Sequence, residues 1–160
     1  MTESTAAGVH DILLARSQTL AVAESLTGGL LAATIVDVPG VSATFRGGVV
    51  VYATDLKATL AGVDPALLER YGPVSAEVAA ALAQGVRRRC AATWGISTTG
   101  VAGPTPQDGE PPGRVFVGVA GPDGVDTREL VLSRTRHDVR AATVAAALEA
   151  LHARLAAAGA

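Results

Sequence analysis

The sequence has little of several residue types, and each scarcity excludes a class of protein. Cys90 is the only cysteine among 160 residues, so an intrachain disulfide framework and a cysteine-rich zinc site are both excluded. Aromatic residues make up 3% of the chain, too few for a platform on which nucleic-acid bases stack. The net charge of −2 gives no electrostatic attraction to nucleic acid or to an anionic membrane surface. We therefore expect no nucleic-acid or membrane partner.

The N-terminal segment also lacks the features of a targeting sequence. Residues 1–18 show no basic stretch followed by an apolar one, and no apolar run approaches the roughly 20 residues that span a bilayer. A chain with one cysteine suits a reducing compartment. Hydrophobic residues make up 49% of the chain, which is enough to build a core. We expect a soluble, cytoplasmic protein with a single domain over residues 1–160.

The order of helix-like and strand-like patterns predicts an α/β domain. The early strands alternate with helices, which favours parallel pairing, and the last two strands are joined by a tight GPDG turn, which favours a hairpin. We therefore predict a three-layer α/β/α fold whose mixed, mainly parallel sheet carries a late antiparallel hairpin. The expected helices cover residues 5–18, 28–36, 54–61, 65–71, 76–92 and 136–158, and the expected strands cover residues 19–24, 46–53, 93–99, 114–120 and 125–133.

Two expected helices begin after residues that can cap them. Ser75 precedes the helix over residues 76–92, and its hydroxyl can accept a hydrogen bond from the first turn. Either Ser133 or Thr135 can cap the last helix in the same way. Residues 100–113 form a long loop rich in glycine and proline. Loops of this length in compact domains are uncommon and often functional.

The segment AESLTGG joins an expected strand to an expected helix and contains Ser25, Thr27, Gly28 and Gly29. At such a turn in an open α/β sheet, free backbone N–H groups and the positive end of a helix dipole can receive a ligand. The alternative is that Ser25 or Thr27 caps the helix and the glycines serve only the turn. The segment has neither the GxGxxG spacing nor the Walker lysine, so it is not a known nucleotide-binding motif.

Lys57 is the only lysine in the chain, because the other 12 of the 13 basic residues are arginines. It follows Tyr52, which ends an apolar strand. Burial near strand ends lowers the pKa of a lysine, and a neutral lysine can act as a base, which arginine cannot. Such a lysine can activate a serine hydroxyl as a nucleophile. The alternative is a solvated surface lysine.

Two further segments carry hydroxyl side chains beside expected strands. Ser42 lies in a Pro/Gly loop before the strand of Tyr52, and it is either a nucleophile or a hydroxyl that stabilises the turn. Thr99 ends a later strand, and Gly100 and Gly103 open the long loop. Backbone N–H groups in that loop can bind an anion or an amide.

Three arginines stand at the start of the last helix, where the helix dipole disfavours positive charge unless an anion is bound. A phosphate ligand fits this arrangement, and a solvated charged face is the alternative. The arginines are Arg134, Arg136 and Arg140. The histidines are scattered without metal-ligand spacing: His10, His137 and His152. Asp108 and Glu110 in the long loop are the remaining candidates for a cation, and we expect no metal.

Several of these segments, taken in order, resemble one known family. AESLTGG, DVPGVSATFRGGVVVYATDLKATLAGV, YGPVSAEVA, TTGVAGP and SRTRHDVR together resemble the C-terminal domain of the competence/damage-inducible CinA proteins. The resemblance covers about residues 5–155. Standalone members of this family include a nicotinamide-nucleotide amidohydrolase. The resemblance implies hydrolysis of the carboxamide of nicotinamide mononucleotide, which gives nicotinate mononucleotide and ammonia without a cofactor.

The resemblance also implies roles for particular residues. The implied catalytic residues are Ser25, Ser42, Tyr52 and Lys57. Lys57 would take the proton of a serine, and we favour Ser42 as the nucleophile because it is the freer hydroxyl, with Ser25 as the alternative. Tyr52 would relay a proton to the leaving ammonia. The expected substrate-binding residues are Thr27, Gly28, Gly29, Thr99, Gly100, Ala102, Gly103, and Arg136 or Arg140 for the phosphate.

The sequence departs from many relatives at two places near the expected site. Ala53–Thr54 stand where many relatives have Ser-Asn, and residues 105–108, Thr-Pro-Gln-Asp, stand where many have a glycine-rich run. Both leave the expected catalytic groups in place, but they change polar contacts and a loop that covers the substrate. The second hypothesis is a non-catalytic domain that binds a nucleotide or a protein, and the third is a hydrolase that acts on another small amide with the same catalytic residues. We also expect a homodimer, because small apolar-rich domains often self-associate.

Overall fold

The computed structural model describes residues 2–159, so Met1 and Ala160, the two ends of the expected domain, lie outside it. Five strands form one sheet in the order β2-β1-β3-β4-β5. β2 and β3 both run parallel to β1, whereas β4 is antiparallel to β3 and to β5. The strands are β1 (Leu20–Glu24), β2 (Phe45–Val50), β3 (Trp94–Gly100), β4 (Arg114–Gly121) and β5 (Gly124–Val131).

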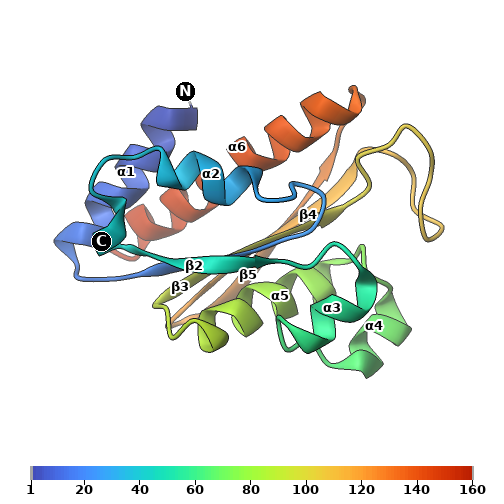
Figure 1. Cartoon of the computed structure of the whole chain (residues 1–160), viewed down its shortest axis with the longest axis horizontal. Coiled ribbons are helices and arrows are strands. Elements are labelled where there is room, and N and C mark those ends of the chain that lie inside the picture. The colour runs from blue at the N-terminus through green and yellow to red at the C-terminus, as the bar shows by residue number, and fades with distance from the viewer. Residues whose placement is uncertain (1, 160) are drawn as a thin grey trace.

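Helices cover both faces of this sheet, which confirms the predicted three-layer α/β/α fold (Figure 1). One layer contains α1 (Thr2–Ala15), α2 (Leu30–Val36) and α6 (Arg136–Ala157). The other contains α3 (Thr54–Thr59), α4 (Pro65–Tyr71) and α5 (Ala76–Arg89). A short 3-10 helix, η1 (Val41–Ala43), precedes β2. The mixed sheet and the late hairpin are confirmed as well, with two parallel and two antiparallel strand pairings.

The core lies on both sides of β1 and β3, the central strands, whose apolar side chains are buried. Trp94, Leu148 and Leu151 are among the buried residues between the sheet and α6. On the other face, α5 packs very close to the sheet. A Cβ added at Gly95 of β3 would lie only 2.2 Å from the carbonyl oxygen of Ala83 in α5, which is too short for two non-bonded atoms. Glycine at this position therefore sets the distance between the helix and the sheet.

The predicted helix caps can be compared directly with the structure. The hydroxyl of Ser75 accepts a hydrogen bond from the N–H of Val78, as predicted for α5. Of the two candidates for α6, Thr135 is the cap, and its hydroxyl accepts from the N–H of Asp138. Both helices therefore start where the sequence placed them.

α6 is apolar and long enough, by length and composition, to cross a membrane, and it is the only such helix among residues 2–159. The expectation that no apolar segment reaches this length is corrected accordingly. Core helices of soluble proteins meet the same criterion. α6 packs against α1, β3 and β4, and its buried side chains, Leu148 and Leu155 among them, belong to the core of this α/β domain.

Candidate active site

The carboxyl ends of the three parallel strands meet at one edge of the sheet and form a pocket there. Ser25 directly follows β1, Tyr52 follows β2, and Thr99 and Gly100 end β3. Lys57 of α3 completes this wall from the second helix layer. Ligands of open α/β sheets gather at this edge, so the fold brings the predicted residues to the expected place.

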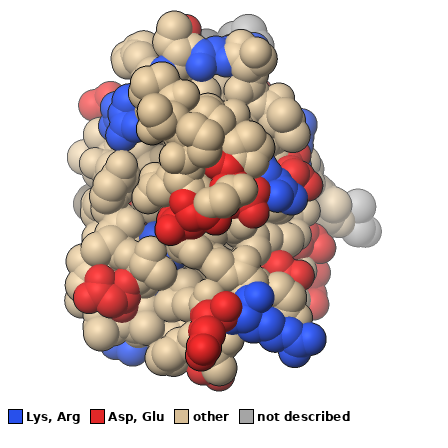
Figure 2. Space-filling model, turned by 90° about the vertical axis from the view of Figure 1, so that its right-hand side faces the viewer, with Lys and Arg blue, Asp and Glu red and all other residues tan. Residues whose placement is uncertain are grey.

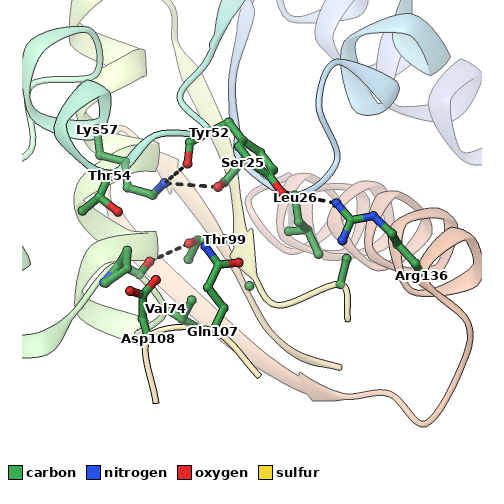
Figure 3. Close-up of a pocket in the computed structure, with 13 residues that line it drawn as sticks. Ser25, Leu26, Tyr52, Thr54, Lys57, Val74, Thr99, Gln107, Asp108 and Arg136 are labelled. Carbon is green, nitrogen blue, oxygen red and sulfur yellow. Dashed lines mark hydrogen bonds between the residues drawn. The ribbon is translucent and has the colours of Figure 1, made fainter. Parts of the chain in front are cut away.

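Ser25 and Lys57 form a buried pair in this pocket (Figure 3). Lys57 Nζ lies 3.1 Å from Ser25 Oγ and donates to the carbonyl oxygen of Val51 at 2.7 Å. Lys57 is 2% exposed, and Ser25 is 7% exposed. The surface-lysine alternative is therefore wrong, and the lysine is held against a serine hydroxyl.

Burial lowers the pKa of Lys57 from 10.5 to about 8, and the negative charge of Asp108 partly opposes this by raising it. Desolvation penalises the ammonium form, because the three protein oxygens around Nζ replace bulk water only in part. A lysine with a pKa near 8 has a substantial neutral fraction close to physiological pH. It can therefore take a proton from the hydroxyl that it contacts.

The backbone of Ser25 is fixed by β3. Its N–H lies 3.1 Å from the carbonyl oxygen of Thr98 and 3.3 Å from the Thr98 hydroxyl. These contacts hold the residue at the end of β1, so its side chain is free to face Lys57. Ser25 does not cap α2, whose N-cap is Gly29 with no side-chain cap.

Ser42 lies at the other end of β2, and its expected proximity to Lys57 is corrected by the structure. Ser42 is an exposed residue of η1, which precedes β2, whereas Tyr52 and Lys57 follow the strand. The strand Phe45–Val50 between them spans roughly 16 Å at about 3.3 Å per residue. Ser42 is therefore not brought together with the Ser25–Lys57 pair.

Thr27 lies behind the pocket wall and supports the turn. Its hydroxyl donates to Glu24 Oε1 at 2.6 Å and lies 2.8 Å from the hydroxyl of Thr98. The buried carboxylate of Glu24 also accepts from the N–H groups of Leu31 at 2.8 Å and Ala32 at 2.9 Å. Glu24 thus joins β1 to the first turn of α2. We did not predict this role, although a glutamate at the end of an apolar strand was the signal for it.

Gly28 and Gly29 give the turn its shape and lie outside the pocket wall. Their φ angles are +57° and +102°, a region that favours glycine. Arg140 fixes the same turn, since its Nε donates to the carbonyl oxygen of Leu26 at 2.9 Å and its Nη2 to that of Thr27 at 3.1 Å. The guanidinium of Arg140 is therefore engaged by the backbone.

Arg136, one helical turn earlier, lines the pocket (Figure 3). Its Nη1 donates to the carbonyl oxygen of Gly103 at 2.7 Å, and its Nη2 lies 3.2 Å from the hydroxyl of Tyr52. The Tyr52 hydroxyl thus contacts Arg136, and only the Tyr52 carbonyl oxygen reaches Lys57 Nζ, at 3.5 Å. Arg134 is exposed.

The remaining wall comes from β3 and the long loop after it. Thr99, Gly100 and Ala102 line the pocket, and the hydroxyl of Thr99 donates to the carbonyl oxygen of Pro73 at 2.6 Å. The loop also contributes Gln107 and Asp108. We expected residues 105–108 to lie in a loop over the substrate, but neither residue was predicted to line the pocket, because loop residues carry no periodic pattern that places them.

The candidate cation ligands of this loop have different surroundings. Asp108 lines the pocket, whereas Glu110 is bound to Arg114. Within residues 2–159, no three His, Cys, Asp or Glu side chains lie close enough together to hold a metal ion. The donor set in the pocket is instead hydroxyl, amine, guanidinium, amide and one carboxylate.

The fold and the pocket define an open α/β domain with a serine–lysine pair at the carboxyl ends of its parallel strands. Residues 2–155 match the family described as the CinA C-terminal domain. The chain therefore belongs to the CinA C-terminal domain family.

Relatives and solved structures agree with this assignment. The chain is 55% identical to a CinA-like protein of Frankia casuarinae and 51% identical to one of Thermosynechococcus vestitus, over 88% and 84% of its length. It spans only 33% of the length of either relative. A CinA superfamily protein from Klebsiella pneumoniae has a TM-score of 0.93 at 29% identity, with 98% of each chain covered. For the competence/damage inducible protein CihA from Agrobacterium tumefaciens, the TM-score is 0.90 at 32% identity, covering 95% of this chain and 94% of that one.

Proposed function

We propose that the chain is an amidohydrolase that converts nicotinamide mononucleotide into nicotinate mononucleotide and ammonia. The observation that carries this proposal is the contact between Ser25 Oγ and Lys57 Nζ, 3.1 Å apart and buried in a pocket. A buried lysine with a lowered pKa beside a serine is an established arrangement for nucleophilic attack on an amide. The substrate is taken from the family resemblance, and the pocket has groups that suit it.

In the first half of the reaction, neutral Lys57 takes the proton of the Ser25 hydroxyl, and the serine oxygen attacks the carboxamide carbon. The negative oxygen of the tetrahedral intermediate needs backbone N–H donors. We assign the N–H of Leu26, the residue after the nucleophile, to this role, by analogy with the α/β-hydrolases. Lys57 then gives its proton to the leaving nitrogen, the C–N bond breaks, and ammonia departs from an acyl-enzyme.

In the second half, a water molecule attacks the acyl-enzyme and gives its proton to Lys57. The ester bond to Ser25 breaks, the serine oxygen takes the proton back, and nicotinate mononucleotide leaves. Arg136 lines the pocket and would bind the substrate phosphate, because a guanidinium suits a phosphate oxygen pair. Tyr52 holds the guanidinium of Arg136 and serves the phosphate side of the pocket rather than the proton transfer.

The test is ammonia release from nicotinamide mononucleotide by the purified protein and by the variants Ser25→Ala and Ser42→Ala. We expect release by the wild type and by Ser42→Ala, and none by Ser25→Ala. A wild type that binds the nucleotide and releases no ammonia would instead indicate a non-catalytic binding domain. A cytoplasmic location and a homodimer belong to the same proposal, and gel filtration with light scattering checks the second.

A further inference from the structure

The long loop after β3 contains a tight turn with Asp108 and Gly109 at its centre. The N–H of Gln107 donates to the carbonyl oxygen of Glu110 at 3.1 Å, and the N–H of Glu110 donates back to that of Gln107 at 2.9 Å. The two residues between them, Asp108 and Gly109, have φ angles of +53° and +76°. Left-handed φ at both central residues is the geometry of a two-residue hairpin turn, for which Asp-Gly is a preferred sequence.

Ion pairs anchor this turn to the sheet. Arg114, at the start of β4, binds Glu110 at 2.5 Å and Glu129 of β5 at 2.8 Å. Prolines at positions 104, 106, 111 and 112 flank the turn and restrict its backbone. Figure 1 shows the loop projecting beyond the end of the sheet. These contacts and prolines restrict the backbone that carries Asp108.

Asp108 is the one carboxylate that lines the pocket, among the residues that the structure describes. Figure 3 shows Asp108 and Arg136 on opposite sides of the pocket, whose third charged side chain is Lys57. Figure 2 shows the side of the molecule from which the loop projects, and acidic side chains gather near the centre of that face. The negative charge of Asp108 reaches Lys57, since it raises the pKa of that lysine.

We propose that Asp108 is a specificity-determining residue that selects substrates whose carboxamide is attached to a positively charged ring over those with a neutral ring. This inference rests on the proposed function, which places the carboxamide carbon against Ser25 Oγ. The ring then lies in the part of the pocket between Ser25 and the loop, within the field of the Asp108 carboxylate. A cationic ring is attracted there, whereas a neutral ring of the same shape gains nothing.

Glu110 does not share this role. Its carboxylate is paired with Arg114, which also binds Glu129, and it does not line the pocket. The sign of the charge on the loop side of the pocket therefore depends on one side chain. Asparagine at position 108 would remove the charge and keep the turn, because asparagine also tolerates left-handed φ and is favoured at this turn position.

The experiment compares the binding of two ligands that differ by one hydride on the ring and therefore in ring charge. Nicotinamide mononucleotide carries a pyridinium cation, and its reduced dihydropyridine form has the same amide, ribose and phosphate with a neutral ring. Calorimetric Kd values are measured on three proteins that cannot turn the ligand over: Ser25→Ala, Ser25→Ala/Asp108→Asn and Ser25→Ala/Asp55→Asn. Asp55 is the matched control, an exposed carboxylate in the same helix as Lys57 but outside the pocket wall.

We expect the first and third proteins to prefer the cationic ligand, and the preference to fall about five-fold in the Asp108→Asn protein, the size of one solvent-accessible charge pair. An unchanged ratio of the two Kd values in the Asp108→Asn protein overturns the inference. An equal fall in the Asp55→Asn protein overturns it as well, since the effect would then be one of net charge. If none of the three proteins binds the cationic ligand, the inference is overturned as well.

The proposed function is tested separately by ammonia release from the protein with Ser25 intact. No ammonia together with a charge preference that depends on Asp108 overturns the amidohydrolase function and leaves the role of Asp108 supported. Ammonia release, together with a ratio of Kd values that Asp108→Asn leaves unchanged, supports the amidohydrolase function and overturns the role of Asp108.

Discussion

Replacing Lys57 with methionine should change how the stability of the protein depends on pH. Methionine has a similar length and fills the same buried space, but it carries no charge and does not titrate. In the folded protein the pKa of Lys57 is about 8, whereas 10.5 is its ordinary value and that of the unfolded chain. The two values differ by an amount that corresponds to about 3 kcal/mol of unfolding free energy.

The direction of the effect follows from which state binds more protons. Between pH 8 and pH 10.5 the unfolded chain keeps the Lys57 proton and the folded chain has lost it, so the stability of the wild type rises with pH in this window. This contribution is fully present above pH 10.5 and is lost as the pH falls through 8. Below that value Lys57 is charged in both states and adds no further pH dependence.

The assay is urea unfolding of the wild type and Lys57→Met at intervals from pH 6 to pH 10.5. Other groups titrate in both proteins, so the difference between their unfolding free energies isolates Lys57. We expect this difference to be flat below pH 7 and to shift by about 3 kcal/mol in favour of the wild type at the upper end. A difference that stays flat across the whole range would refute a lowered pKa, and with it the argument that Lys57 is a base.

Three further predictions concern other parts of the site and the fold. Glu24→Gln should lower the unfolding free energy by about 1–3 kcal/mol in urea unfolding, because charge-assisted hydrogen bonds to the first turn of α2 are weakened. Gly95→Ala should lower it by more than about 2 kcal/mol, since a Cβ there would meet a backbone oxygen of α5 at 2.2 Å; a variant as stable as the wild type would contradict this packing. Arg136→Ala should raise the KM for nicotinamide mononucleotide about ten-fold or more and leave the Kd of its phosphate-free nucleoside unchanged; an equal loss for both ligands excludes a phosphate contact.

The sequence predicted the fold and most of the pocket because local signals were strong. Strand 20–24 is apolar up to Glu24, strand 94–100 is a run of apolar, glycine and hydroxyl-bearing residues, and each is followed by a turn or a loop. Their carboxyl ends must meet once the strands pair in parallel, so Ser25 and Thr99 could be placed together without coordinates. Lys57 stood out because every other basic residue is an arginine.

The structure contradicts the expected closeness of Ser42 to Lys57, and the order of the residues already contained the reason. Ser42 precedes β2 and Lys57 follows it, so an extended strand has to separate them. We favoured Ser42 because a hydroxyl on a loop is free to move, and we did not consider the length of the strand that separates it from Lys57. Ser25 follows β1, the parallel neighbour of β2, and that pairing brings it to the same end of the sheet as Lys57.

Arg136 and Arg140 could not be distinguished from sequence, for a different reason. They are one helical turn apart and share a face of α6, so periodicity treats them alike. Only the packing of α6 against the turn after β1 decides that Arg140 contacts backbone oxygens while Arg136 reaches the pocket. The position of Asp108 likewise depends on contacts between a loop and distant strands.

The most direct test of the account is the site of covalent attachment during turnover. The protein is mixed with nicotinamide mononucleotide, quenched in acid within the first turnover and digested, and the peptides that contain Ser25 and Ser42 are compared by mass spectrometry. We predict an acyl adduct on Ser25 in the wild type and in Lys57→Arg no adduct at all, because arginine does not accept the proton. An adduct on the Ser42 peptide, or ammonia release by Ser25→Ala, would contradict the assignment of Ser25 and Lys57 as the catalytic pair.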